Sequence, residues 1–197
     1  FFAERRIDLA VGEAVVAIDR GRGRVELADG GSRPYDHLVL ATGARNRPVP
    51  GAVPAAGVVQ LRTLADAAAL RDRLGSLRRV AIVGAGLIGL EFAAVASERG
   101  IDVAVFEADG RVMARSLSRP TAEVLRGFHE GRGVRFSFGT IVTDFLSESG
   151  RVAGVATADG GTHPADLVLV AIGVVPNAEL AAAAGLAVAG GIVVDDH

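Results

Sequence analysis

One stretch, VAIVGAGLIGLEFAAVASERGIDVAVFE at residues 80–107, constrains the fold more than any other part of the sequence. An aliphatic run leads into Gly84-x-Gly86-x-x-Gly89, a helix-like segment follows, and a second aliphatic run ends at Glu107. The pattern predicts a strand, a tight turn, a helix and a second strand, which is the βαβ unit of a parallel sheet. Gly84 would permit the turn, Gly86 would let a diphosphate approach the backbone, and Gly89 would let the helix pack closely on the strand.

The same unit predicts a dinucleotide site. The helix N-terminus would offer free N–H groups and the positive end of its dipole to phosphates. Glu107 would accept hydrogen bonds from the adenosine ribose hydroxyls and would repel a 2′-phosphate, since two like charges ~4 Å apart at an effective dielectric constant near 20 cost about 4 kcal/mol. We therefore expect NAD(H) to be preferred over NADP(H). The alternative is a βαβ unit whose glycines serve packing alone.

The remaining pattern predicts an α/β fold, with a Rossmann-like parallel sheet and an antiparallel β-meander. Helices are expected at 64–74, with Thr63 as N-cap, and at 87–99, 120–130 and 178–184. Strands are expected in the first 60 residues and after the central unit, at 7–9, 14–18, 24–27, 37–41, 58–61, 134–138 and 192–195. The meander is expected at 141–147, 151–158 and 162–170.

Composition excludes several classes of function. The 197 residues carry a net charge of −2, which argues against a surface for nucleic acid or an anionic membrane. No apolar run reaches the ~18–20 residues that span a bilayer. The chain has no cysteine, so it holds no disulfide or thiolate site, and a cytoplasmic location is compatible with this. All basic residues other than histidine are arginines, and the four scattered histidines are interpreted as turn or surface residues that form no metal site: His37, His129, His163 and His197.

Two further aliphatic runs each deliver a glycine, in LVLATGA at 38–44 and LVLVAIGVVPN at 167–177. Buried strands that end in glycine place bare backbone near a ligand. Two core strands that each end in an ordinary turn are the alternative on the bare sequence.

Together these motifs resemble the pyridine nucleotide–disulfide oxidoreductase superfamily, and within it the ferredoxin and rubredoxin reductases that serve oxygenases. The resemblance rests on YDHLVLATGARNRPVPG, LRTLADAAALR, VAIVGAGLIGLEFAAVASERGIDVAVFEADGRVMAR and PADLVLVAIGVVPNAELAAAAGLAVAGGIVVD. It implies a truncated two-dinucleotide-binding flavoprotein fold. Residues 1–50 would be part of an FAD-binding domain, 51–175 an NAD(H)-binding Rossmann-like domain, and 176–197 a return segment. The Pro48–Pro54 stretch is the expected boundary, and the chain is expected to be a piece of a longer protein.

The resemblance also implies roles for residues on the NADH side. The pyrophosphate and the adjoining ribose would be held by Gly84, Ala85, Gly86, Leu87, Ile88 and Gly89. Glu107 would take the adenosine ribose, and Arg115 would lie against the adenine, with a solvated loop arginine as the alternative. Glu91 would be the catalytic acid near the nicotinamide, unless it only interacts with the helix dipole. Ile172 and Gly173 would lie at the nicotinamide half.

On the FAD side, the resemblance implies contacts from the Val15 backbone, Thr42, Gly43 and Arg62, with Arg45 as a weaker candidate. The implied function is an NADH-dependent flavoprotein reductase that passes a hydride from NADH to FAD, and electrons on to a ferredoxin- or rubredoxin-type acceptor. Such chemistry needs positioning rather than a side-chain nucleophile. The fragment itself is expected to be inactive.

Two other interpretations stay open: a non-enzymatic dinucleotide-binding or redox-sensing flavoprotein module, and an NADH-dependent disulfide or nitrite reductase relative. The thioredoxin-reductase type is disfavoured, because its redox cysteines would lie within the NAD domain and this chain has none.

Overall fold

A computed structural model describes residues 1–53 and 55–196. The chain forms two compact units, residues 46–174 and residues 1–45 with 175–197. It passes between them within two short strands, β4 (Ala44–Asn46) and β13 (Val174–Pro176). The assignment of these units to an NAD(H)-binding and an FAD-binding domain stays a prediction.

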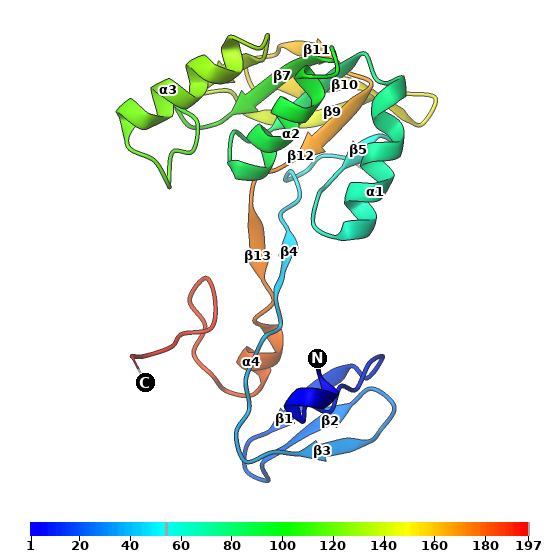
Figure 1. The fold of residues 1–197 in the computed structure, drawn as a ribbon, viewed down its shortest axis with the longest axis vertical. Coiled ribbons are helices and arrows are strands. Elements are labelled where there is room, and N and C mark those ends of the chain that lie inside the picture. The colour runs from blue at the N-terminus through cyan, green and yellow to red at the C-terminus, as the bar shows by residue number, and fades with distance from the viewer. Residues whose placement is uncertain (54, 197) are drawn as a thin grey trace. The chain divides into compact units, whose positions relative to one another are not determined.

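The larger unit is built on a parallel five-stranded sheet in the order β5-β12-β6-β7-β8. Figure 1 labels its strands β5, β12 and β7. Its strands are β5 (Val58–Val59), β12 (Leu167–Val170), β6 (Arg79–Val83), β7 (Asp102–Glu107) and β8 (Arg135–Phe138). Its helices are α1 (Leu64–Arg73), α2 (Leu87–Ser97) and α3 (Arg119–Glu130), and the 3₁₀ turn η2 covers Leu74–Ser76. The predicted fold class is confirmed, because this parallel sheet is combined with antiparallel strands.

Both faces of this sheet are covered, which explains its continuous aliphatic strands. Successive side chains of a strand point to opposite faces. In β6, Val80 and Ile82 pack in a core with residues of α1, α2 and α3. Ala81 and Val83 pack on the other side with residues of the antiparallel strands β9 and β10.

These antiparallel strands form the meander β11-β10-β9. Their bounds are β9 (Val142–Glu148), β10 (Arg151–Thr157) and β11 (Thr162–Pro164). The prediction of one meander strand over 162–170 is wrong in its second half. Leu167–Val170 is fully buried and pairs in parallel with β5 and β6, so it is a strand of the central sheet.

The smaller unit holds the antiparallel sheet β1-β2-β3 and two short helical segments. Its elements are η1 (Ala3–Arg5), β1 (Val15–Asp19), β2 (Arg24–Leu27), β3 (Ser32–Pro34) and α4 (Glu179–Ala183). Helix α4 packs against β1, and the Arg20 guanidinium donates to the carbonyl of Ala184 at 3.3 Å.

Three predicted strands, 7–9, 37–41 and 192–195, are wrong. A strand exists only through its pairing, and within the described residues none of these runs has a neighbouring ladder. Leu38 and Val39, for example, are 38% and 85% exposed. In the last run only Ile192 takes part, through a single bridge to Val188.

The histidine prediction is correct for His37, which is exposed, and wrong for His129, which is buried in α3 because that face of the helix packs on the sheet. His163 lies half-buried in β11 with its ring 4.7 Å from that of Phe106. His197 lies outside the described residues. No helix in the described part of the chain combines the length and the apolar character that crossing a membrane requires.

Candidate functional site

The turn between β6 and α2 brings two backbones into direct contact. Gly84 has a φ of +105°, and a Cβ there would lie 2.6 Å from the carbonyl oxygen of Ala171. A Cβ on Gly89 would lie only 2.2 Å from the carbonyl oxygen of Gly84. Any side chain at either position would therefore force the helix, the turn or the neighbouring strand end to move.

Gly86 is in the opposite situation. It is the N-cap residue of α2, no side chain caps this end of the helix, and a Cβ added at Gly86 would meet no atom within 4 Å. The first turn of α2 therefore begins beside open space. Unpaired N–H groups and the positive end of the helix dipole make such an end suitable for an anion.

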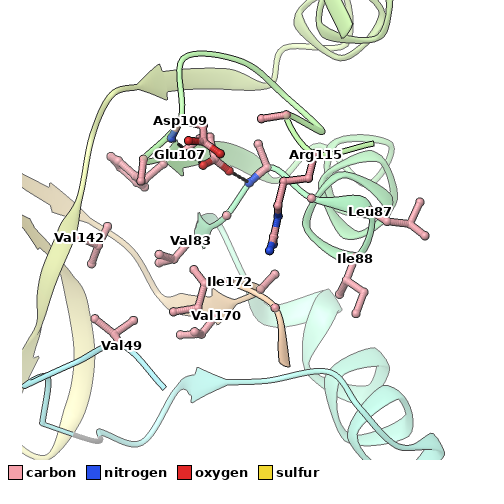
Figure 2. A pocket seen from close by; sticks show the side chains of 18 of the residues that line it. Val49, Val83, Leu87, Ile88, Glu107, Asp109, Arg115, Val142, Val170 and Ile172 are labelled. Atoms are coloured by element: carbon pink, nitrogen blue, oxygen red, sulfur yellow. Dashed lines mark hydrogen bonds between the residues drawn. The ribbon is translucent and has the colours of Figure 1, made fainter. Parts of the chain in front are cut away.

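Glu107, the last residue of β7, is attached to this turn. One carboxylate oxygen accepts a hydrogen bond from the Ala85 N–H at 2.6 Å, and the other accepts one from the Asp109 N–H at 2.8 Å (Figure 2). An ionised carboxylate has about four lone-pair sites. The carboxylate is thus held in place while it keeps acceptor capacity for hydroxyl groups.

The loop after β7 is tied to the same turn. Met113 donates its backbone N–H to the Ala85 carbonyl at 3.0 Å, with a φ of +48°. The half-buried Arg111 guanidinium donates to the carbonyls of Ala114 and Leu117 within the loop, the latter at 2.7 Å. These bonds order the segment that carries Arg115.

Arg115 extends from this loop into the cavity beside the turn (Figure 2). Its guanidinium lies 3.6 Å from the position that a Cβ on Gly173 would occupy. This is the strand end at which we expect the nicotinamide half, whereas the sequence resemblance places Arg115 at the adenine. The part of a dinucleotide that Arg115 contacts stays a prediction.

The cavity has a volume of about 620 Å³ and lies wholly within the larger unit. Most of the predicted residues of the NADH side line it together: Gly84, Ala85, Gly86, Leu87, Ile88, Glu107, Arg115, Ile172 and Gly173. The structure thus brings together, in one hollow at the carboxyl ends of the parallel strands, residues that lie up to 89 positions apart in the sequence (84 to 173).

Three other predicted residues of this unit do not line the cavity. Gly89 lies beneath the turn, in contact with backbone. Glu91 is an exposed residue of α2. Arg62 precedes α1 and donates its backbone N–H to Asp66 at 3.0 Å, next to the capping box that Thr63 and Asp66 form.

The remaining predicted residues belong to the smaller unit and lie in two places. Val15 lines a separate cavity of about 590 Å³ in that unit. Thr42 donates its hydroxyl to the Asn177 carbonyl at 2.5 Å, and the Gly43 carbonyl accepts from the Asn177 N–H. Gly43 has a φ of +67°, and a Cβ added there would meet no atom within 4 Å. Arg45 donates to the Asn177 side chain at 2.9 Å and pairs with Glu179 at 2.8 Å.

Several cavity residues were not predicted from the sequence. They include the apolar Val49, Met113 and Val142 and the polar Asp109 and Thr140. Asp109 carried a usable signal, since it lies two residues after the predicted ribose acid at the carboxyl end of the same strand. The others come from connections whose position depends on the fold of the whole unit.

The site offers an anion-binding helix end, a bound carboxylate and an apolar wall. The described residues contain no group of three or more histidine or acidic side chains arranged for a metal. A concave apolar lining with a few fixed polar groups is suited to holding and orienting a ligand.

Comparisons with known proteins agree with this geometry. A family model described as pyridine nucleotide-disulphide oxidoreductase matches residues 3–197. Rhodocoxin reductase of Rhodococcus erythropolis is 48% identical over 200 residues, which cover 100% of this chain and 46% of that protein. Putidaredoxin reductase of Pseudomonas putida is 41% identical over 202 residues, which cover 100% of this chain and 48% of that protein.

A solved structure gives the same picture. The ferredoxin reductase for the CYP199A2 system from Rhodopseudomonas palustris superposes with a TM-score of 0.93 at 44% identity, over 98% of this chain and 48% of that one. The chain therefore spans about half the length of the curated relatives it matches.

Proposed function

Since the chain belongs to the pyridine nucleotide-disulphide oxidoreductase family, we propose that it carries the NADH site of an FAD-dependent reductase. The whole protein would pass a hydride from NADH to FAD, and electrons on to a ferredoxin- or rubredoxin-type acceptor. The relatives named rhodocoxin reductase and putidaredoxin reductase support the acceptor class. A cytoplasmic location is part of the same proposal, and cell fractionation would test it.

One observation carries the NADH assignment: the bare turn at Gly86 is open, and Glu107 is attached to it through the Ala85 N–H. The open helix end would receive the pyrophosphate, and the free lone pairs of Glu107 would accept the adenosine ribose hydroxyls. Leu87 and Ile88, which line the cavity, would pack against the ligand. Ile172 and Gly173 would border its nicotinamide half.

The chain's own residues would act by positioning. The walls of the cavity would hold the nicotinamide ring in one orientation and keep water away from it, and such alignment supplies much of the rate in transfers between two bound cofactors. Glu91 is exposed in α2 and would approach the ring from outside the cavity lining. We assign it no proton transfer.

For FAD, the smaller unit supplies Gly43, whose positive φ and open surroundings fit a backbone that a cofactor approaches closely. Thr42 and the Val15 backbone would add further contacts from the same unit, and Arg62 stays a predicted contact from the larger one. When bound, FAD supplies the hydride-accepting and electron-transferring chemistry.

Glu107→Gln tests the NADH site. The amide keeps one oxygen for the Ala85 N–H but removes the charge, and a hydrogen bond to a charged group contributes about 1.5–3 kcal/mol. We expect roughly 10- to 100-fold weaker NADH binding in the full-length protein, measured by calorimetry. Unchanged NADH affinity would overturn the assignment of Glu107.

The enzymatic activity is tested separately. NADH added anaerobically to the full-length, FAD-loaded protein should bleach the flavin absorbance, and the reduced protein should then reduce a ferredoxin or rubredoxin. A protein that binds NADH while its flavin stays oxidised would instead be a non-enzymatic dinucleotide-binding module.

A further inference from the structure

The mouth of the cavity carries a second carboxylate, Asp109, two residues after Glu107. Both residues line the cavity, and Figure 2 shows them at the same end of it. Asp109 is exposed, and its carboxylate makes no hydrogen bond or ion pair with another of the described residues. Its charge is therefore available to a ligand bound at this end.

The position of Asp109 is set by its backbone. Its N–H donates to Glu107 Oε1 at 2.8 Å, and its carbonyl accepts from the Gly139 N–H at 3.2 Å. In parallel, the Glu107 carbonyl accepts from the Thr140 N–H at 3.0 Å. The two acids are thus fastened to the connection between β8 and β9 and cannot separate without breaking these bonds.

Among the described residues, no arginine forms an ion pair with Glu107 or Asp109. Arg111, the nearest arginine in the sequence, uses its guanidinium on the carbonyls of Ala114 and Leu117. Arg115 has its guanidinium beside Gly173. Within the part of the chain that the structure describes, the ion pairs all lie elsewhere and include neither acid.

From this arrangement we propose that Asp109 is a second specificity-determining residue, which excludes the 2′-phosphate of NADPH beside the ribose-binding Glu107. The inference rests on the proposed NADH site and deepens it. Glu107 would both bind the ribose and repel a phosphate. Asp109 would act by charge alone, because its carboxylate makes no hydrogen bond or ion pair with the described residues that form the site. A phosphate carries about −1.5 to −2 charges at neutral pH, so one added exposed carboxylate roughly 8 Å away in water should weaken its binding about fivefold at low salt.

The test uses the full-length protein and two ligands that differ only in the 2′-phosphate, 5′-AMP and adenosine 2′,5′-bisphosphate. Asp109→Asn keeps the size of the side chain and its backbone bonds. Asp72→Asn is the matched control, because Asp72 is an exposed acid of α1 outside the cavity lining. Calorimetric affinities for both ligands, and for NADH and NADPH, are measured at low salt and at about 0.5 M salt, where charges are screened within a few ångströms.

We expect Asp109→Asn to raise the affinity for the bisphosphate and for NADPH about fivefold, and to change the affinity for 5′-AMP and NADH less than twofold. The increase should disappear at high salt. Asp72→Asn should leave unchanged the ratio of the affinities for the bisphosphate and 5′-AMP, and the ratio of those for NADPH and NADH. Equal affinity ratios in Asp109→Asn and Asp72→Asn would overturn the inference. A parallel loss of affinity for 5′-AMP and NADH in Asp109→Asn would also overturn it, since Asp109 would then be a ribose ligand. A wild-type protein that binds neither NADH nor 5′-AMP would overturn the proposed function itself.

Discussion

Gly89→Ala is the substitution whose cost the structure defines most closely. The added Cβ would lie 2.2 Å from the Gly84 carbonyl oxygen and 3.2 Å from Ile82 Cγ2. The oxygen belongs to a tight turn, so it cannot rotate away as a side chain would. Overpacking costs about 1–3 kcal/mol, and the clash with backbone places this case at the upper end. Since alanine gains about 0.5–1 kcal/mol over glycine within a helix, we expect a net loss of about 2 kcal/mol.

Gly127→Ala is the matched control, because Gly127 lies exposed within α3 and a Cβ there would meet nothing within 4 Å. This variant should be more stable than wild type by about 0.5–1 kcal/mol. Urea unfolding followed by circular dichroism would measure both. The two chemically identical changes should differ by roughly 3 kcal/mol in the free energy of unfolding.

Gly86→Ala separates packing from binding at the same turn. Its Cβ would meet no atom of the chain, so the cost should stay within about 1 kcal/mol, through the weaker N-cap. The methyl group would nevertheless occupy the space where a diphosphate approaches, and NADH affinity should fall. If Gly89→Ala and Gly127→Ala shift the unfolding midpoint equally, or if Gly86→Ala binds NADH as wild type does, the roles assigned to these glycines are refuted.

Two further predictions concern the surroundings of the site. Arg111→Gln should release the loop, because an amide cannot bridge the carbonyls of Ala114 and Leu117, and limited trypsin digestion should then cut faster after Arg115. Trypsin resistance equal to that of wild type would contradict this. Burial and, to a lesser extent, the charge of Arg132 lower the pKa of His129 below 6.5. Between that lowered pKa and 6.5, the unfolded chain therefore binds more protons than the folded chain. The free energy of unfolding should therefore rise with pH across this window. The slope of the unfolding midpoint against pH should be smaller in His129→Leu, and an unchanged slope would exclude His129 as its source.

The central sheet and its glycine turn could be predicted because local sequence determines them. The stretch 80–83 in β6 is apolar at every position, as a strand covered on both faces must be, and Gly84 and Gly89 stand where backbone meets backbone. Thr63 is recognisable as an N-cap for a similar reason: its capping box involves only residues up to Asp66.

The strand errors arise where pairing with a distant segment decides the outcome. The aliphatic run at 37–41 has the composition of a strand, but its residues find no neighbouring ladder within the described part of the smaller unit. The sequence prediction places His129 on the surface, although helical spacing sets it on the same face of α3 as the buried Ala122, seven positions earlier. Asp109 is missed although it lies only two residues after Glu107, whereas its hydrogen bond with Gly139, thirty positions away (139 − 109), could not be predicted from local sequence.

At the acidic end of the cavity, the charge that would determine cofactor specificity is separate from the hydrogen bonds that hold the loop in place. Three separate segments meet there through hydrogen bonds: the glycine turn through the Ala85 N–H, the end of β7 through the Glu107 carboxylate and carbonyl, and the β8–β9 connection through the N–H groups of Gly139 and Thr140. The Asp109 side chain takes no part in these hydrogen bonds. Removing its charge should therefore alter cofactor preference without rearranging the loop. Exclusion of a 2′-phosphate would then be a property of two side chains. A chain that accepts NADPH would need both charges removed and a free cation supplied, since Arg111 is already bound to the loop carbonyls.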